Sequence, residues 1–233
     1  MGKYSNYNPL KVRLHVVALK ALQLGVVGTV SATTLLTSLD INSVTFRIAT
    51  HTLFNCIFHF LEFLVTALCN CEEVDDDSFI LTDPELFYVY IAAVLEAATK
   101  SLSFPYLPKL TFTWFALGLV TVVLGQFCRS LAMYTAGASF HHHIQREASE
   151  KRPLVTRGIY SVMRHPSYFG YFWWFVGSQV LLQNPVVGFL GAYKLIKFFK
   201  DRISYEEEFL VAFFGPEYVE YRRNTSTKIP FIP

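Results

Sequence analysis

The sequence carries little charge for its length. Asp, Glu, Lys and Arg make up 16% of its 233 residues, whereas an average soluble domain carries about 25%. Hydrophobic residues reach 52% and aromatic residues 16%, and they gather in runs close to the ~20 residues that a helix needs to cross a bilayer. The composition therefore excludes an ordinary soluble domain and predicts a polytopic membrane protein.

The sequence also lacks the common motifs of phosphate binding, metal catalysis and nucleophilic catalysis. It has no Gly-rich phosphate loop, no nucleophile elbow and no HExxH motif. The four cysteines lie in or beside apolar runs without the spacing of a metal site or a disulfide framework, and we interpret them as buried thiols. Residues 141–143 are consecutive histidines, but adjacent side chains point in different directions, so we expect no metal site there.

Six apolar runs predict an all-α fold, a polytopic integral membrane protein with about six transmembrane helices in hairpins. The predicted spans are residues 12–36, 44–69, 86–104, 111–132, 166–183 and 186–199. Residues 201–222 follow as an amphipathic helix, because Ile203, Leu210 and Phe213 recur at helical spacing.

Basic residues predict the orientation of these spans. Residues 133–165 form the longest polar stretch and are rich in Arg and Lys, so the positive-inside rule places them in the cytosol. Four spans precede this stretch, which puts the N-terminus in the cytosol as well. We therefore divide the chain into a four-span membrane region, 1–132, and a C-terminal region, 133–233, with a cytosolic loop, a two-span hairpin, the amphipathic helix and a tail.

Two pairs of ionisable residues lie in predicted apolar surroundings, where burying a charge is energetically unfavourable. His59 and Glu62 share one face of the second span, and either lock helices together or line a pocket. Glu206 and Glu207 fall on the apolar stripe of the amphipathic helix, whereas Glu208 points elsewhere. Two carboxylates on a buried face need cationic partners. The partner is either an arginine, Arg202 or Arg164, or a charged ligand.

Arg164 and His165 lie at the junction between the polar stretch and the fifth span. Pro166 disfavours helical geometry at His165 and suits the first turn of a helix, so we expect the helix to begin at Pro166 with both residues just outside. Arg164 either anchors the helix by the positive-inside rule or binds an anion. Cations, carboxylates and aromatics beside an apolar region suit group transfer from a charged cofactor to a lipid-borne acceptor.

Several segments resemble the isoprenylcysteine carboxyl methyltransferases, in particular the shorter six-span fungal form. The resemblance covers roughly residues 50–232. The matching segments are residues 58–63, 135–142, 154–160, 164–170, 184–185, 198–207, 213–221 and 229–232. Residues 224–227, Asn-Thr-Ser-Thr, depart from the family pattern, which usually has a Val and a Gly-containing turn there.

The resemblance implies an enzyme that transfers a methyl group from S-adenosylmethionine to the C-terminal carboxylate of a farnesylated or geranylgeranylated protein. It implies multi-pass residence in the endoplasmic reticulum membrane, with the active site facing the cytosol. The implied partners are the lipid bilayer and the prenylated cysteine, with no nucleic acid and with homo-oligomerisation left open. Arg164 and Glu207 are the implied catalytic residues. The implied cofactor-binding residues are His142, Gln145, Val155, Tyr160, His165, Pro166, Tyr168 and Glu206.

Three other functions are compatible with parts of the sequence. The Arg-His-Pro segment is shared with phospholipid methyltransferases, which are typically shorter, and with NADPH-dependent membrane sterol reductases, which are generally longer. The glutamate pair at 206–207 and the closing tail favour the narrower family. A non-enzymatic membrane scaffold would leave the clustered Arg, His and Glu residues unexplained.

Overall fold

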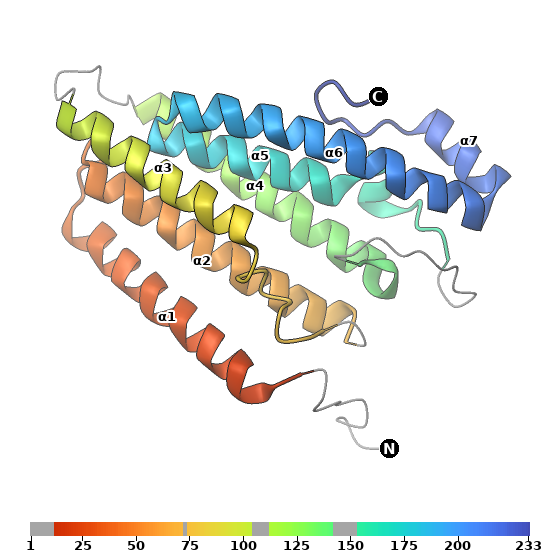
Figure 1. Ribbon diagram of the computed structural model, residues 1–233, viewed down its shortest axis with the longest axis horizontal. Coiled ribbons are helices and arrows are strands. Elements are labelled where there is room, and N and C mark those ends of the chain that lie inside the picture. Colours follow the sequence, from red (N-terminus) through yellow and green to blue (C-terminus); the bar gives the residue numbers. More distant parts are fainter. Residues whose placement is uncertain (1–11, 72–73, 104–111, 142–152) are drawn as a thin grey trace.

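The computed structural model describes residues 12–71, 74–103, 112–141 and 153–233, and these residues form helices and connecting loops without any strand (Figure 1). Seven α-helices follow one another along this part of the chain: α1 (Leu14–Thr37), α2 (Val44–Cys69), α3 (Pro84–Ser103), α4 (Phe112–Ala136), α5 (Pro166–Leu182), α6 (Pro185–Phe214) and α7 (Pro216–Asn224). Two short 3₁₀ turns, η1 (Gly137–Ser139) and η2 (Gly158–Ser161), lie between α4 and α5.

The first four predicted spans are confirmed as helices, with ends close to the predicted ones. Helices α1 to α4 are long and apolar enough to cross a membrane. Their apolar side chains remain largely exposed at the surface of the bundle, as lipid-facing residues must be. The predicted turn between the third and fourth spans lies outside the described residues.

The prediction of a separate amphipathic helix over 201–222 was wrong, because this segment continues the helix of the sixth predicted span and is interrupted at Gly215. Helix α6 runs without a break from Pro185 to Phe214, through the boundary that the change of polarity suggested. It ends where Gly215 adopts a positive φ of 55° and Pro216 starts α7. A change from apolar to charged residues does not stop a helix, whereas a glycine followed by a proline does.

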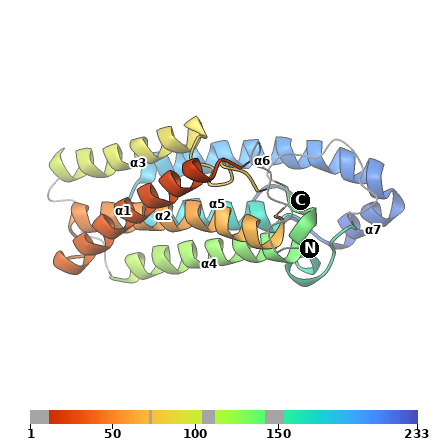
Figure 2. The same cartoon turned by 90° about the horizontal axis from the view of Figure 1, so that it is seen from below.

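Glycines bring α4 and α5 into backbone contact. A Cβ on Gly125 would lie 2.5 Å from the backbone N of Trp174 and 2.7 Å from Gly170 O, and Gly118 faces Gly177 in the same way. Small residues permit such close packing of helices within lipid. Figure 2 shows α5 held between α4 on one side and α3 and α6 on the other.

A buried ion pair joins α2 to α4 beside this contact. Arg129 Nε lies 2.5 Å from Glu62 Oε1, and Arg129 Nη1 donates to Ser167 Oγ at 3.1 Å. His59 is not the partner of Glu62, because its Nδ1 instead lies 2.8 Å from Phe79 O. Glu62 therefore does lock helices together, but through a residue 67 positions away. The lock fixes the start of α5 against α2 and α4.

The acidic segment after α2 folds back against the bundle. The Asp76 carboxylate pairs with Arg13, just before α1, and Lys20 of α1 donates to the Asp76 backbone carbonyl and pairs with Asp77. The Arg13 guanidinium holds the pKa of the Asp76 carboxyl below its usual value. Phe79 is fully buried and stacks on Phe63, with ring centroids 4.3 Å apart. The segment thus forms one wall of the cavity described below.

Candidate active site

The candidate site lies at one end of the bundle, where segments far apart in sequence meet. The end of α4, turn η2, the start of α5, the second half of α6, α7 and the C-terminal tail all reach this end (Figure 1). Ile229 and Ile232 of the tail are buried in a cluster with Phe172, Phe199 and Ile203. The tail is therefore packed into the structure beside the site.

Arg164 is held by three acceptors. Its Nε donates to Glu207 Oε1 at 2.5 Å, its Nη1 to Thr225 O at 2.7 Å and its Nη2 to Pro233 O at 2.6 Å. Among the partners that the sequence left open, Arg164 is the one that Glu207 contacts, and the catalytic role of both residues stays a prediction. A planar guanidinium held at three corners has a fixed orientation.

Glu207 contacts both Arg164 and His165, which lie just before the start of α5. Its Oε1 also lies 3.0 Å from His165 Nε2, and Arg222 of α7 approaches its Oε2 at 3.7 Å. Burial alone would raise the pKa of the carboxyl, but the hydrogen bonds from His165 and Arg164 outweigh it and hold the pKa at about 2. Glu208 is exposed, as the helical spacing predicted.

Glu206 belongs to a second group of side chains, one residue along α6. Tyr168 donates to Glu206 Oε2 at 2.7 Å and accepts from Arg202 Nε at 2.8 Å. His165 stacks on the Tyr168 ring, with centroids 5.5 Å apart and planes 6° from parallel. The side chain of Glu206 remains 29% exposed, so this carboxylate, unlike that of Glu207, is accessible to a ligand.

Tyr160 in η2 completes the polar group. Its backbone carbonyl accepts a hydrogen bond of 2.6 Å from the Tyr221 hydroxyl of α7. Burial, together with the nearby Glu206 carboxylate, raises the pKa of the Tyr160 hydroxyl above its usual value. The phenol is therefore neutral at physiological pH.

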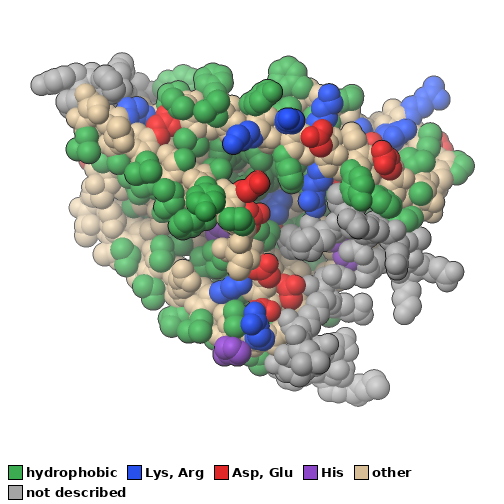
Figure 3. Space-filling view, in the orientation of Figure 1, with side chains coloured by type: hydrophobic (Ala, Val, Ile, Leu, Met, Phe, Trp, Pro, Cys, Tyr) green, Lys and Arg blue, Asp and Glu red, His purple; other side chains and the backbone are tan. Residues whose placement is uncertain are grey.

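These groups line a cavity of about 1490 Å³, more than the roughly 300–1,000 Å³ of an ordinary ligand pocket. Tyr160, Arg164, His165, Tyr168 and Glu206 line its polar end. An apolar part of the lining comes from α3, α5 and α6: Leu86, Val89, Phe175, Leu195, Phe198 and Phe199. The acidic segment before α3 lines another part, with Asp75, Asp77 and Asp83. Figure 3 shows the molecular face hollowed near its middle, with acidic and basic side chains around the hollow.

The structure brings most of the predicted site residues to this cavity. Val155 and Pro166 line it together with the five polar residues named above. Glu207 lies behind Arg164 and His165 and does not line the cavity. His142 and Gln145 lie outside the described residues. Tyr218 and Tyr221 of α7 also line it, and the sequence analysis missed both, although they lie in the tail segment that resembles the family.

Comparisons with known proteins agree with this arrangement. A model of the isoprenylcysteine carboxyl methyltransferase (ICMT) family matches residues 116–212. The protein-S-isoprenylcysteine O-methyltransferase of Saccharomyces cerevisiae is 41% identical over 182 residues, an alignment that covers 76% of each chain. The human protein of the same name is 42% identical over 178 residues, which cover 76% of this chain and 62% of the human one.

A solved structure is also similar over nearly the whole fold. The structure of the eukaryotic intramembrane Ras methyltransferase ICMT superposes with a TM-score of 0.87 and 33% sequence identity, covering 93% of this chain and 77% of that one. The similarity therefore includes the helices that carry the cavity and its polar end. The chain belongs to the isoprenylcysteine carboxyl methyltransferase family.

Proposed function

We propose that this protein transfers a methyl group from S-adenosylmethionine to the C-terminal carboxylate of a prenylated cysteine in other proteins. The observation that carries the proposal is that one large cavity has two chemically different parts. Arg164, Tyr168 and Glu206 line its polar end, and side chains of α3, α5 and α6 form an apolar wall. A charged cofactor fits the first part and an isoprenoid fits the second.

The polar end matches the chemical groups of the cofactor. S-adenosylmethionine has a cationic sulfonium and ammonium, a carboxylate and an aromatic adenine. Glu206 offers an accessible carboxylate for the cationic groups, and the rings of Tyr160, His165 and Tyr168 offer faces for adenine or sulfonium. We propose that these residues hold the cofactor, together with Val155, Pro166, His142 and Gln145. When bound, it supplies the methyl group on a positively charged leaving group.

Arg164 is proposed to hold the acceptor carboxylate. A carboxylate is ionised at neutral pH, so the reaction needs orientation and removal of water rather than a general base. Three of the five N–H donors of Arg164 are engaged within the described part of the chain. The other two remain for a bidentate or single contact with the substrate at the cavity wall.

Glu207 is proposed to act through Arg164 rather than on the substrate. Its carboxylate contacts both Arg164 and His165 from outside the cavity lining. It fixes the plane of the guanidinium and balances its charge when no substrate is bound. Glu207 is therefore a positioning residue, and Arg164 is the catalytic residue in this proposal.

The apolar part of the cavity is proposed to hold the isoprenoid. Burial of apolar groups contributes roughly 0.8 kcal/mol per CH₂, so the lipid should supply most of the substrate affinity. The lining by Leu86 and Val89 of α3 and Leu195 and Phe198 of α6 places this part beside the membrane-facing helices. A prenyl chain already in the bilayer could then reach the cavity without passing through water.

The same proposal includes six spans and a defined orientation. Helices α5 and the first half of α6 would be the fifth and sixth spans, and the alternating direction of α1 to α6 in Figure 1 then puts the polar end of the cavity on the side of the N-terminus. We place this side in the cytosol, by the positive-inside rule, and the membrane in the endoplasmic reticulum. The boundary between residues 132 and 133 separates two proposed functions and not two folding units, because Gly125 of α4 and Gly170 of α5 pack against each other across it.

The test is methyl transfer by purified protein in detergent micelles or nanodiscs. Labelled S-adenosylmethionine should methylate N-acetyl-S-farnesylcysteine, and N-acetylcysteine without the lipid should not be turned over at a comparable rate. Thermal stabilisation by S-adenosylhomocysteine but not by NADPH would separate this activity from that of a sterol reductase. Equal turnover of prenylated and unprenylated acceptors would contradict the proposal.

A further inference from the structure

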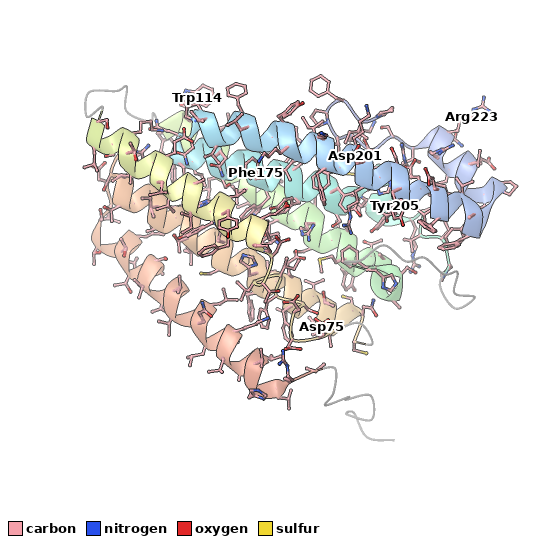
Figure 4. All side chains as sticks on the ribbon, in the orientation of Figure 1. Asp75, Trp114, Phe175, Asp201, Tyr205 and Arg223 are labelled. Atoms are coloured by element: carbon pink, nitrogen blue, oxygen red, sulfur yellow. The ribbon has the colours of Figure 1, made fainter. Side chains whose placement is uncertain are left out.

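A second, smaller cavity of about 30 Å³ lies where α2, α3 and α5 meet. It shares five lining residues with the large cavity: Phe58, Leu86, Val89, Tyr171 and Phe175. Figure 4 places Phe175 in the interior of the bundle, and this residue is 3% exposed. The two cavities therefore adjoin at these residues, and we take the shared side chains as the wall between the apolar part of the large cavity and the small cavity.

The small cavity is polar beyond this wall. His51, Asn55, His59, Tyr90, Ser178 and Gln179 line it in addition to the aromatic and aliphatic side chains. His51 is 3% exposed and stacks on Tyr90, with ring centroids 5.5 Å apart. Polar side chains are costly in the middle of a membrane protein unless they have hydrogen-bond partners.

Two N–H groups, each on a residue that lines the small cavity, lack a partner among the described residues. Asn55 Nδ2 donates to the backbone carbonyl of His51 at 2.8 Å, which identifies it as the amide nitrogen, and it lies 3.2 Å from His51 Nε2. His51 Nε2 is therefore the acceptor, and the proton of the neutral ring sits on Nδ1. This Nδ1 and Trp174 Nε1 are both buried without a hydrogen-bond acceptor in this part of the chain.

We propose that the small cavity binds ordered water through His51 and Trp174, and that this polar floor limits the length of isoprenoid that the enzyme accepts. One water accepts two hydrogen bonds, which matches the two N–H donors, and donates to oxygens such as that of Ser178. The volume of about 30 Å³ exceeds the roughly 10–15 Å³ that a single water requires. Water is the ligand of choice because several polar side chains line the cavity and its volume is too small for an organic molecule.

The second half of the proposal follows from the position of the floor, and it rests on the proposed function. Ser178 follows Tyr168 by ten residues in α5, a rise of about 15 Å along the helix. An isoprenoid that extends from the polar end along α5 meets Tyr171 and Phe175 first and the small cavity behind them. A longer chain would have to displace the water and leave the His51 and Trp174 N–H groups facing hydrocarbon.

The experiment compares kcat/KM for N-acetyl-cysteines that carry geranyl, farnesyl, geranylgeranyl and longer isoprenoids. His51→Leu removes one donor and puts an apolar side chain in its place, and Trp174→Phe removes the other donor while keeping an aromatic ring. The matched controls are His15→Leu on the exposed part of α1 and Trp114→Phe, whose parent side chain is 56% exposed.

Each of the two cavity variants should raise kcat/KM for the longest acceptors relative to farnesyl by about fivefold, since the penalty for leaving a polar group unpaired is gone. The controls should leave this ratio unchanged. An experimental structure that resolves water should show an oxygen within hydrogen-bond reach of both His51 Nδ1 and Trp174 Nε1, which survives in Trp114→Phe.

Two results would overturn the inference: an unchanged length preference in every folded cavity variant, or a well-resolved cavity without water density. Trp174→Phe keeps the test open if His51→Leu does not fold. A wild-type protein that fails to methylate the farnesyl acceptor would count against the proposed function instead, and the water site would still be judged by the structure.

Discussion

Arg164 Nε and Glu207 Oε1 lie 2.5 Å apart although 43 residues separate them in the chain. Their side chains are only 8% and 9% exposed, so neither charge can turn to solvent when the other is removed. Such pairs offset the cost of burying two charges only when further hydrogen bonds complete the geometry, and His165, Thr225 and Pro233 supply these here. The pair joins the start of α5 to the far half of α6.

Arg164→Lys should lower kcat by about 10- to 100-fold, because a lysine keeps the charge but loses one or two charge-assisted hydrogen bonds of ~1.5–3 kcal/mol each. The affinity for S-adenosylhomocysteine, measured by calorimetry, should change little. Arg223→Lys is the control, since Arg223 lies exposed on α7 and away from the cavity (Figure 4). If the Arg164→Lys protein is folded and has the wild-type kcat, the proposed role of the guanidinium fork is wrong.

Glu207→Gln should also lower kcat, whereas Glu208→Gln should leave it at the wild-type value. The first change removes the carboxylate that holds Arg164 and His165, and the second affects an exposed neighbour on the same helix. As a positioning residue, Glu207 should affect kcat more than the KM for the cofactor. Equal effects of the two changes would show that the loss reflects the charge of α6 in general.

The free energy of unfolding should fall in acid because of Glu207. Its folded-state pKa of about 2 lies below the ordinary value of 4.5, so the stabilising contribution is fully present above pH about 4.5 and is lost as the pH falls through about 2. The linkage amounts to about 3 kcal/mol, an order-of-magnitude figure for a largely buried group. Thermal unfolding from pH 6 to pH 2 should show a steeper loss in wild type than in Glu207→Gln; parallel curves would refute this.

Gly125→Ala should lower the Tm, because a Cβ there would lie 2.5 Å from the backbone N of Trp174 and 2.7 Å from Gly170 O. Backbone atoms cannot rotate away, so α4 and α5 must separate, at a cost of about 1–3 kcal/mol. Gly25→Ala on α1 is the matched control, since nothing lies within 4 Å of its Cβ position. Alanine should leave stability there unchanged or raise it. An equal response at both positions would contradict the close helix contact.

The local sequence was sufficient for the helices and for the boundaries that glycine and proline define. The start of α5 at Pro166, with Arg164 and His165 just before it, follows from the fixed φ of proline and its effect on the preceding residue. The exposure of Glu208 beside the buried Glu207 follows from the 3.6-residue period. The same rules gave the wrong end for the sixth predicted span, because polarity changed along α6 without any helix-breaking residue.

The tertiary structure alone decided which charges pair. The sequence left Arg164, Arg202 or a ligand as possible partners of Glu206 and Glu207. In the structure, Glu207 contacts Arg164 and His165, and Glu206 accepts a hydrogen bond from Tyr168. Glu62 likewise pairs with Arg129 and not with His59, its neighbour on the same face of α2. Periodicity determines which way a side chain points from its own helix, but the residue that it meets depends on how α4, α5 and α6 pack, and glycine contacts between distant segments set that packing.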